Sequence, residues 1–169
     1  MKIGIALLAY NRPKHLKKVI DAIVKEKIKS INIYIDGPAD KKVQNNQEKI
    51  LKVLKNYKSK ILINLIRQTK NNGLAFSVTN AVTSELKYND AVILLEDDCV
   101  PLNGFFDYMI GGLKKYRFKK NVRSVCSYNN LDIKSESAFF LKRFNPWGWA
   151  TWKDRWKKHN FEIKNTILQ

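Results

Sequence analysis

The sequence has few cysteines and no long hydrophobic run. Cys99 and Cys126 are the only two cysteines among 169 residues, their spacing matches no metal-binding pattern, and they imply no disulfide framework. No apolar stretch approaches the roughly 18 residues needed to span a bilayer. The apolar run Ile3–Ala9 is short, lacks a cleavage site and leads into a helix start, so it predicts a strand rather than a signal peptide. We therefore expect a protein of a reducing compartment, in the cytoplasm or peripheral on the inner face of the membrane.

Glycine-rich phosphate-binding loops are also missing. None of the seven glycines belongs to a G-x-G-x-x-G or a G-x-x-x-x-G-K-[ST] pattern. Their absence argues against a dinucleotide-binding enzyme and against a P-loop protein.

Arginine is scarce although the chain is strongly basic. The formal charge is +17, but only six of the 32 basic residues are arginine. Recognition of phosphates and bases favours the bidentate guanidinium group, whereas scattered lysines usually lie on solvated helix surfaces. We interpret the charge as a surface bias and expect no nucleic-acid partner. A weak attraction to anionic membranes or acidic glycans is the secondary interpretation.

The elements that are present alternate regularly along the chain. Apolar strand-like runs are found at Ile3–Ala9, Ile31–Ile35, Ile61–Ile66 and Ala91–Leu95. Amphipathic helical runs separate them, beginning at Pro13, covering Lys41–Tyr57 and passing through Ala75–Val82. This order predicts an α/β fold with an open, mainly parallel sheet and helices on both faces. The length and the hydrophobic content of 44% suit a single domain over residues 1–169.

The pattern changes in the last third of the chain. Phe105–Tyr116 predicts a helix, and Val122–Tyr128 and Ala138–Phe144 predict two further strands. The segment Phe144–Trp156 then holds all four tryptophans. Because the sequence stops at Gln169 after a polar stretch without a closing element, we expect the chain to be truncated at its carboxyl end.

Three consecutive carboxylates follow the fourth strand. Glu96, Asp97 and Asp98 repel one another, so donors, water or a cation must relieve their charge. Mg²⁺ or Mn²⁺ commonly takes one or two protein carboxylates and completes its shell with water and substrate phosphate oxygens. The triplet therefore predicts either a metal site, with Asp98 as the direct ligand, or a solvated acidic loop.

Polar residues also follow the other predicted strands. Open α/β sheets bind ligands at the carboxyl ends of their strands, so these residues are expected along one edge. Tyr10, Asn11 and Arg12 follow the first strand, and Arg12 would hold phosphate. Asp36 would accept hydrogen bonds from a base or a ribose. Asn72 and Gly73 would let the backbone approach a sugar or phosphate. A surface arginine, a plain Asp-Gly turn and a helix-entry turn are the alternatives.

The tryptophan segment has two interpretations that stay open. Trp147, Gly148 and Trp149 follow a proline and combine a rigid turn with flat aromatic faces. Such faces suit stacking against the apolar side of a sugar ring. The same tryptophans equally suit a hydrophobic core.

Together these segments resemble a nucleotide-sugar glycosyltransferase of the GT-A fold, which is Rossmann-like. More narrowly, they resemble the broad family 2 group that contains N-acetylglucosaminyltransferase I and its bacterial relatives. The likeness rests on AYNRP, IDG, VILLEDDCVP followed by FFDYM, SVCSYNN and FNPWGW, in the family's order. It assigns residues 1–103 to the half that binds the nucleotide sugar and residues 104–169 to the start of the half that binds the acceptor.

The resemblance implies a function and roles for particular residues. It implies a divalent metal, Mn²⁺ or Mg²⁺, on Asp98, nucleotide contacts from Glu96 and Asp97, base recognition by Asp36 and phosphate contact from Arg12. It implies transfer from a UDP-sugar to a hydroxyl of a glycan, a lipid-linked acceptor or a protein, with inversion. The catalytic base of such enzymes lies beyond the FNPWGW segment, so we expect it beyond Gln169; Asp154 is more in keeping with a structural role.

Three alternatives remain beside glycosyl transfer. A nucleotidyltransferase shares this architecture and metal use, although it normally has a glycine-rich basic loop after its first strand. A truncated fragment would bind nucleotide without turnover. A basic module that binds nucleic acid or membrane would use the +17 charge alone.

Overall fold

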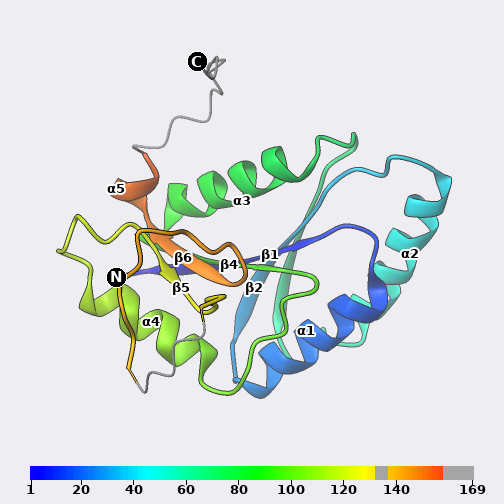
Figure 1. Ribbon diagram of the computed structural model, residues 1–169. Helices are drawn as coiled ribbons and strands as arrows, with labels where there is room; N and C mark the ends of the chain where they lie inside the picture. The colour runs from blue at the N-terminus through cyan, green and yellow to red at the C-terminus, as the bar shows by residue number, and fades with distance from the viewer. Residues whose placement is uncertain (132–136, 158–169) are drawn as a thin grey trace, which may run out of the picture.

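The protein is a layered α/β structure built on one six-stranded sheet (Figure 1). The computed structural model describes residues 1–131 and 137–157. The strands are β1 (Ile3–Ala9), β2 (Ser30–Ile35), β3 (Leu62–Arg67), β4 (Ala91–Glu96), β5 (Val125–Cys126) and β6 (Trp149–Trp152). The helices are α1 (Pro13–Lys25), α2 (Lys41–Lys55), α3 (Leu74–Tyr88), α4 (Phe105–Lys115) and α5 (Lys153–Trp156). The sheet order β3-β2-β1-β4-β6-β5 places the two most hydrophobic strands at its centre.

Strands β1 to β4 are parallel, as the alternation of apolar runs and helices predicts. β1 pairs with β2 on one side and with β4 on the other, for example through Leu7 opposite Leu95. Every residue of β4 before Glu96 is buried because helices cover both faces of this part of the sheet. The predicted α/β class and the open, mainly parallel sheet are confirmed, and the fold is Rossmann-like.

The two faces of the sheet carry different helices. Alternate residues of β1, including Leu7 and Ala9, pack into a cluster with the buried sides of α1, α2 and α4. Ala6 and Leu8 point to the other face and pack with Ala81 of α3. This division follows from the period of two along a strand, which sends successive side chains to opposite faces.

Local sequence signals start the helices where expected. Pro13 occupies the first turn of α1, where its missing N–H costs nothing. The Asp40 carboxylate caps α2 by accepting a hydrogen bond from Val43 N at 2.7 Å. Gly73 precedes α3 with φ of +82°, a conformation that favours glycine.

The last third of the chain differs from the sequence prediction. The strand expected at Val122–Tyr128 shortens to Val125–Cys126, and Ala138–Phe144 forms no strand but an exposed segment. The strand lies instead in the tryptophan segment, at Trp149–Trp152, antiparallel to β4. All four residues of β6 are buried, as suits a strand beside the buried β4. Residues 138–144 are exposed and do not pair with β4.

Two connections cross closely at the carboxyl edge of the sheet. Gly37, after β2, donates its N–H to the carbonyl oxygen of Lys70, after β3, at 3.2 Å. A Cβ atom on Gly37 would lie 2.2 Å from the carbonyl carbon of Lys70. Because backbone rather than a flexible side chain occupies that space, only glycine fits there without a shift of the loop.

We predict that Gly37→Ala destabilises the protein by about 1–3 kcal/mol, as overpacking against a fixed backbone does. Gly111→Ala is the control, because Gly111 lies within α4 and a Cβ there meets nothing within 4 Å. That change should stabilise the helix by about 0.5–1 kcal/mol. Urea unfolding measures both, and equal midpoints for the two variants would contradict the close crossing.

Candidate functional site

The structure brings the ends of the four parallel strands to one edge, as the sequence predicts. The backbone N–H of Tyr10, after β1, donates to Asp97, after β4, at 3.2 Å. The backbone amides of Asn72 and Gly73, immediately before α3, donate to Asp36, which follows β2. Residues up to 87 positions apart in sequence therefore share one rim.

Arg12 bridges the two aspartates of the acidic triplet. Its Nη2 lies 2.7 Å from Asp97 Oδ1, and its Nη1 lies 2.8 Å from Asp98 Oδ2. The three groups differ in exposure: Asp97 is 2% exposed, whereas the Arg12 and Asp98 side chains are 44% and 42% exposed. Asp97 is therefore a buried anchor for the guanidinium, while Asp98 and the outer edge of Arg12 face solvent.

Burial and mutual charge set the protonation of this cluster. Burial raises the pKa of Asp97, and the Tyr10 N–H and the charge of Arg12 only partly oppose it. Burial also raises the pKa of Glu96, and the charges of Asp98 and Asp97 raise it further. Partial burial works to lower the pKa of Arg12, but the two aspartates outweigh it and raise that pKa. The cluster thus holds more negative charge than one guanidinium neutralises, which favours a cation at its exposed side.

Asp36 has a different surrounding from the one expected for a base-binding residue. Its carboxylate is nearly buried and accepts hydrogen bonds from the N–H groups of Gly37, Asn72 and Gly73 at 2.8–3.2 Å. These bonds hold the loop before α3 against the end of β2. Asp36 consequently positions the loop at this rim, and its proposed contact with a base competes with three backbone donors.

The Asn71 side chain of the same loop reaches the residue that follows the first strand, and the Asn72 side chain bonds within the loop. Asn71 Nδ2 donates to Tyr10 Oη at 2.9 Å and to the Gly37 carbonyl oxygen at 3.0 Å. Asn72 Nδ2 returns to the Lys70 carbonyl oxygen at 3.0 Å. Tyr10, Asn72 and Gly73 therefore lie together on the rim, with Asn71 as a link that the sequence interpretation did not single out.

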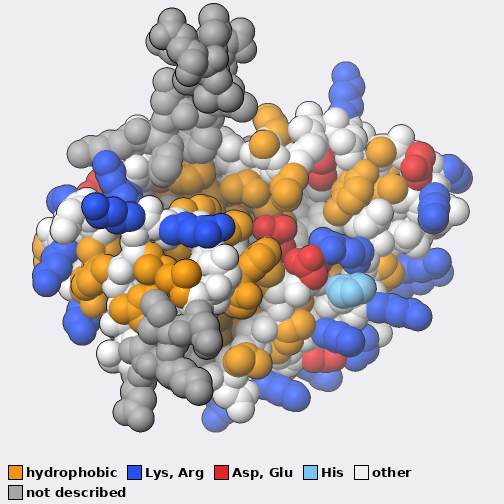
Figure 2. Space-filling view, viewed as in Figure 1, with side chains coloured by type: hydrophobic (Ala, Val, Ile, Leu, Met, Phe, Trp, Pro, Cys, Tyr) orange, Lys and Arg blue, Asp and Glu red, His pale blue; other side chains and the backbone are white. Residues whose placement is uncertain are grey.

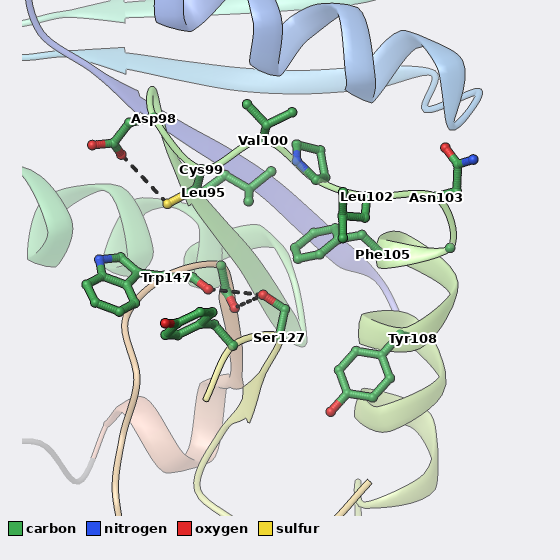
Figure 3. Close-up of a pocket in the computed structure, with 14 residues that line it drawn as sticks. Leu95, Asp98, Cys99, Val100, Leu102, Asn103, Phe105, Tyr108, Ser127 and Trp147 are labelled. Carbon is green, nitrogen blue, oxygen red and sulfur yellow. Dashed lines mark hydrogen bonds between the residues drawn. The ribbon is translucent and has the colours of Figure 1, made fainter. Parts of the chain in front are cut away.

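A cavity of about 640 Å³ opens beside Asp98 (Figure 3). One wall is the segment from Asp98 to Phe105, which leads into α4. The other walls are Tyr108 of α4, the residues Ser127 and Tyr128 after β5, and the Trp147–Gly148 turn. In Figure 3, Asp98 and Trp147 lie at one end of the cavity and Tyr108 at the other. Asp98 belongs both to the charged cluster and to this cavity.

The tryptophan segment divides its residues between cavity and core. Trp147 is 52% exposed, lines the cavity and meets the Tyr128 ring at 4.8 Å between centroids. Gly148 lines it as well; its φ is +68°, and a Cβ there would lie 2.8 Å from Ser127 Oγ. Trp149 lies in β6, is 5% exposed and packs in the core under α3. Of the two interpretations left open for Trp149, its burial favours the core, because little of its ring remains accessible for a sugar to stack on.

Several cavity residues were not predicted from the sequence. Tyr108, Ser127 and Tyr128 come from the FFDYM and SVCSYNN segments, which were noted only as parts of a resemblance. Ser127 Oγ donates toward the carbonyl oxygens of Trp147 and Gly148, both at 3.0 Å, and so ties the turn to β5. The sequence signal for these cavity residues is a tyrosine just past a helix start and another just past a strand. Only the folded structure shows that the two segments line the same cavity.

Neither Cys99 nor Asp154 has the environment of a reactive group. Cys99 lines the cavity, where burial raises the pKa of its thiol to about 11, so it stays protonated at neutral pH. Partial burial works to raise the pKa of Asp154, but hydrogen bonds from Lys120 and Arg155 outweigh it and lower that pKa. Paired in this way at the start of α5, Asp154 fits the expected structural role rather than that of a base.

The carboxylates fit a metal that shares its shell with a ligand. Within residues 1–131 and 137–157, no group of three or more His, Cys, Asp and Glu side chains is placed to hold an ion by itself. Asp98 is nevertheless exposed at the cavity mouth, and Glu96 carries a raised pKa caused in part by its neighbours. One or two carboxylates with phosphate and water are the usual partners of Mg²⁺. The donor set therefore fits such an ion together with a phosphate ligand.

A second cavity, of about 620 Å³, lies at the opposite edge of the sheet, where β1 and β2 begin. The buried Glu85 carboxylate faces it and accepts hydrogen bonds from Tyr34 and Asn32 at 2.8 and 2.5 Å. Burial raises the pKa of the Tyr34 phenol, so it remains a donor to Glu85. This polar network is internally satisfied and far from the strand ends that carry the charged cluster.

Comparison with known proteins supports the fold. No protein-family model and no curated protein sequence matches the chain. A solved mannosyltransferase from Pyrobaculum calidifontis, in complex with GDP-Man and Mn²⁺, aligns with a TM-score of 0.55 and 13% identity over 76% of this chain. This chain spans only 36% of that protein. A 4-diphosphocytidyl-2C-methyl-D-erythritol synthase from Anaerococcus prevotii aligns with a TM-score of 0.57 and 14% identity, over 97% of this chain and 80% of its own.

At these identities the likeness shows a shared fold, found in both a glycosyl- and a nucleotidyltransferase. It does not single out the N-acetylglucosaminyltransferase I group. No helix in the described part of the chain combines the length and apolar character needed to cross a membrane.

We predict that Asp98→Asn lowers the pKa of Glu96, because it removes a neighbouring anion that stabilises the protonated carboxyl. The pKa will stay above its ordinary value, since burial is the larger cause. A raised carboxyl pKa makes the fold lose stability as pH rises from the ordinary toward the raised value, and this loss should be smaller in the variant. Carboxyl ¹³C titration by NMR in metal-free buffer measures the shift. Asp107→Asn in α4 is the control, and an equal change in both variants would refute the coupling.

Proposed function

We propose that the chain binds a nucleoside-diphosphate sugar at the rim formed by Arg12, Asp97 and Asp98, and that it is a metal-dependent glycosyltransferase. The observation that carries this proposal is that Asp98 belongs both to the charged cluster and to the lining of the cavity. The same side chain forms an ion pair with Arg12 and lines an aromatic-walled cavity. A diphosphate at the charged end would therefore place an attached sugar in the cavity.

The charged end has the parts needed to hold a diphosphate. Arg12 is half-exposed and sits immediately before the first turn of α1, where the helix dipole also favours an anion. Its anchor on the buried Asp97 leaves the exposed side of the guanidinium free to turn from Asp98 to a phosphate. A divalent ion on Asp98, when bound, would neutralise charge on the departing diphosphate. Tyr10 and the Asn72–Gly73 backbone lie beside this position.

The aromatic end has the parts needed to hold a sugar. Trp147 and Tyr128 both line the cavity, and their edge-to-face contact does not cover both faces of either ring. Sugar rings present apolar C–H faces that pack on such rings. The positive φ of Gly148 and the Ser127 hydrogen bonds hold the turn in place, so the wall is formed before a ligand arrives.

The finer parts of the proposal come from the sequence resemblance. They are the UDP donor, the inversion at the anomeric carbon, the family 2 likeness to the N-acetylglucosaminyltransferase I group, and an acceptor that is a glycan, a lipid-linked sugar or a protein. In this proposal the described residues supply the donor side of the site. The neighbour that holds GDP-Man makes GDP the second nucleotide to test.

Nucleotidyl transfer is the second candidate, because the synthase neighbour aligns over nearly the whole chain. The connection after β1 favours glycosyl transfer. It consists of Tyr10, Asn11 and Arg12 before α1 begins at Pro13, with no glycine and no lysine in it. A nucleotidyltransferase normally wraps a longer glycine-rich basic loop around a triphosphate, and this short turn leaves no room for one.

We predict that UDP with Mn²⁺ raises the melting temperature of the protein and that Asp98→Ala abolishes the rise. A ligand at about a hundred times its Kd adds about 2.7 kcal/mol to stability. Differential scanning fluorimetry measures the shift, with GDP, CDP and Mn²⁺ alone in parallel. Asp107→Ala is the matched control, because Asp107 is an exposed carboxylate on α4 that does not line the cavity. No shift with any nucleoside diphosphate would overturn the proposal.

The two candidate reactions differ in their products. We expect incubation with a nucleotide sugar, Mn²⁺ and an acceptor or water to release free nucleoside diphosphate, because the anomeric C–O bond to phosphate breaks in glycosyl transfer. A parallel incubation supplies a nucleoside triphosphate and a sugar phosphate, because nucleotidyl transfer cleaves the triphosphate and releases pyrophosphate instead. Anion-exchange chromatography separates these products, and pyrophosphate as the sole product would establish the second candidate.

A further inference from the structure

The outer surfaces of α1 and α2 are unusually rich in lysine. Four lysines lie on α1 and five on α2, and all nine are exposed. They are Lys14, Lys17, Lys18, Lys25, Lys41, Lys42, Lys49, Lys52 and Lys55. The acidic residues within the two helices are Asp21 and Glu48 alone. We refer to these nine lysines as the basic face.

The two helices form one continuous layer. Both cover the same face of the sheet, and they contact each other. A hydrogen bond of 2.6 Å from Tyr57 Oη, just after α2, to Asp21 Oδ1 of α1 ties them together. In Figure 2, many basic side chains lie on the right side of the molecule, where Figure 1 places α1 and α2, and a second group lies on the left.

The nearby carboxylates compensate only part of this charge, because Asp21, Glu26, Asp40 and Glu48 are four against nine lysines. Asp21 binds Lys17 at 2.7 Å and the Tyr57 hydroxyl. Asp40 caps α2, and Glu26 accepts hydrogen bonds from the backbone N–H of Gly104. Glu48 is the one exposed carboxylate of the two helices without such a contact in the described part of the chain.

The opposite layer of the molecule does not share this charge. α3 is as long as α2 but carries one lysine, Lys87, and one acid, the buried Glu85. If the lysines served solubility alone, both helical layers would be expected to carry them. The basic face is therefore a one-sided feature, and it lies outside the residues that line the cavity.

We propose that the basic face docks on an anionic lipid bilayer. Lysine ammonium groups act as point charges without a required geometry, which suits a fluid surface of lipid phosphates. Both helices lie wholly within the described part of the chain, and neither exposes a large apolar side chain or any arginine. Nucleic acids are recognised by stacking on aromatic rings and by guanidinium groups, so this face lacks what that partner needs. The proposal is independent of the proposed function, because docking requires no nucleotide sugar.

The test measures binding of the full chain to vesicles by co-sedimentation. We expect binding to phosphatidylcholine vesicles that contain about one third phosphatidylglycerol, none to phosphatidylcholine alone, and a steep decline as salt is added. Lys→Gln changes at Lys18, Lys25, Lys42 and Lys52 should weaken binding at least about tenfold. None of these four side chains makes a hydrogen bond or ion pair with the described part of the chain, so the fold should persist, as circular dichroism can check.

The control removes the same amount of charge from other surfaces. Lys→Gln changes at the exposed residues Lys2, Lys70, Lys87 and Lys142 should leave binding within about twofold of the unaltered chain. An equal loss in both variants would mean that total charge and not the basic face attracts the bilayer. Absence of binding to anionic vesicles, or tighter binding of a single-stranded oligonucleotide at the same ionic strength, would overturn the proposal. Co-sedimentation of the unaltered chain with anionic and with neutral vesicles decides the first of these outcomes without any variant.

Discussion

The ion pairs between Arg12 and the two aspartates after β4 are the constraint on which the candidate site depends. Three adjacent carboxylates at a strand end are unfavourable alone, and the structure relieves them with one guanidinium and one backbone N–H. Asp97, nearly buried, fixes the position of Arg12, whereas Asp98 remains at the surface. The buried Asp97 therefore holds the cluster in place, and the exposed Asp98 is the carboxylate that a ligand can reach.

A second set of bonds shapes the rest of the rim. The Asp36 carboxylate gathers the N–H groups of the loop before α3, and Gly37 permits the close crossing with Lys70. These contacts bring the Asn71–Gly73 loop beside Tyr10, so that the ends of three strands approach the charged cluster. Asp36 thus acts on the site through the backbone that it orders.

Sequence reasoning identified the parallel core and the rim because both follow from local patterns. Apolar runs of strand length alternate with helical periodicity, and the carboxyl ends of parallel strands must share an edge, which places Arg12 near Asp98. It failed where partners come from distant segments. The Asp36 carboxylate is satisfied by amides 36 and 37 residues away, which no local pattern shows. The sequence pattern of residues 138–144 resembles a strand, but Trp149–Trp152 is the segment that pairs with the edge of β4. Because Trp149 belongs to that strand, it lies in the core and not in the cavity.

The central claim is that a divalent ion and a diphosphate meet at Asp98, between Arg12 and the aromatic cavity. Paramagnetic broadening by Mn²⁺ in the presence of a nucleoside diphosphate tests it most directly, read from amide and indole NMR signals. The account predicts that broadening centres on Asp98, Cys99 and the Trp147 indole and spares the residues around Glu85 at the opposite edge of the sheet. Broadening centred on Glu85, or spread evenly over the surface, would contradict it.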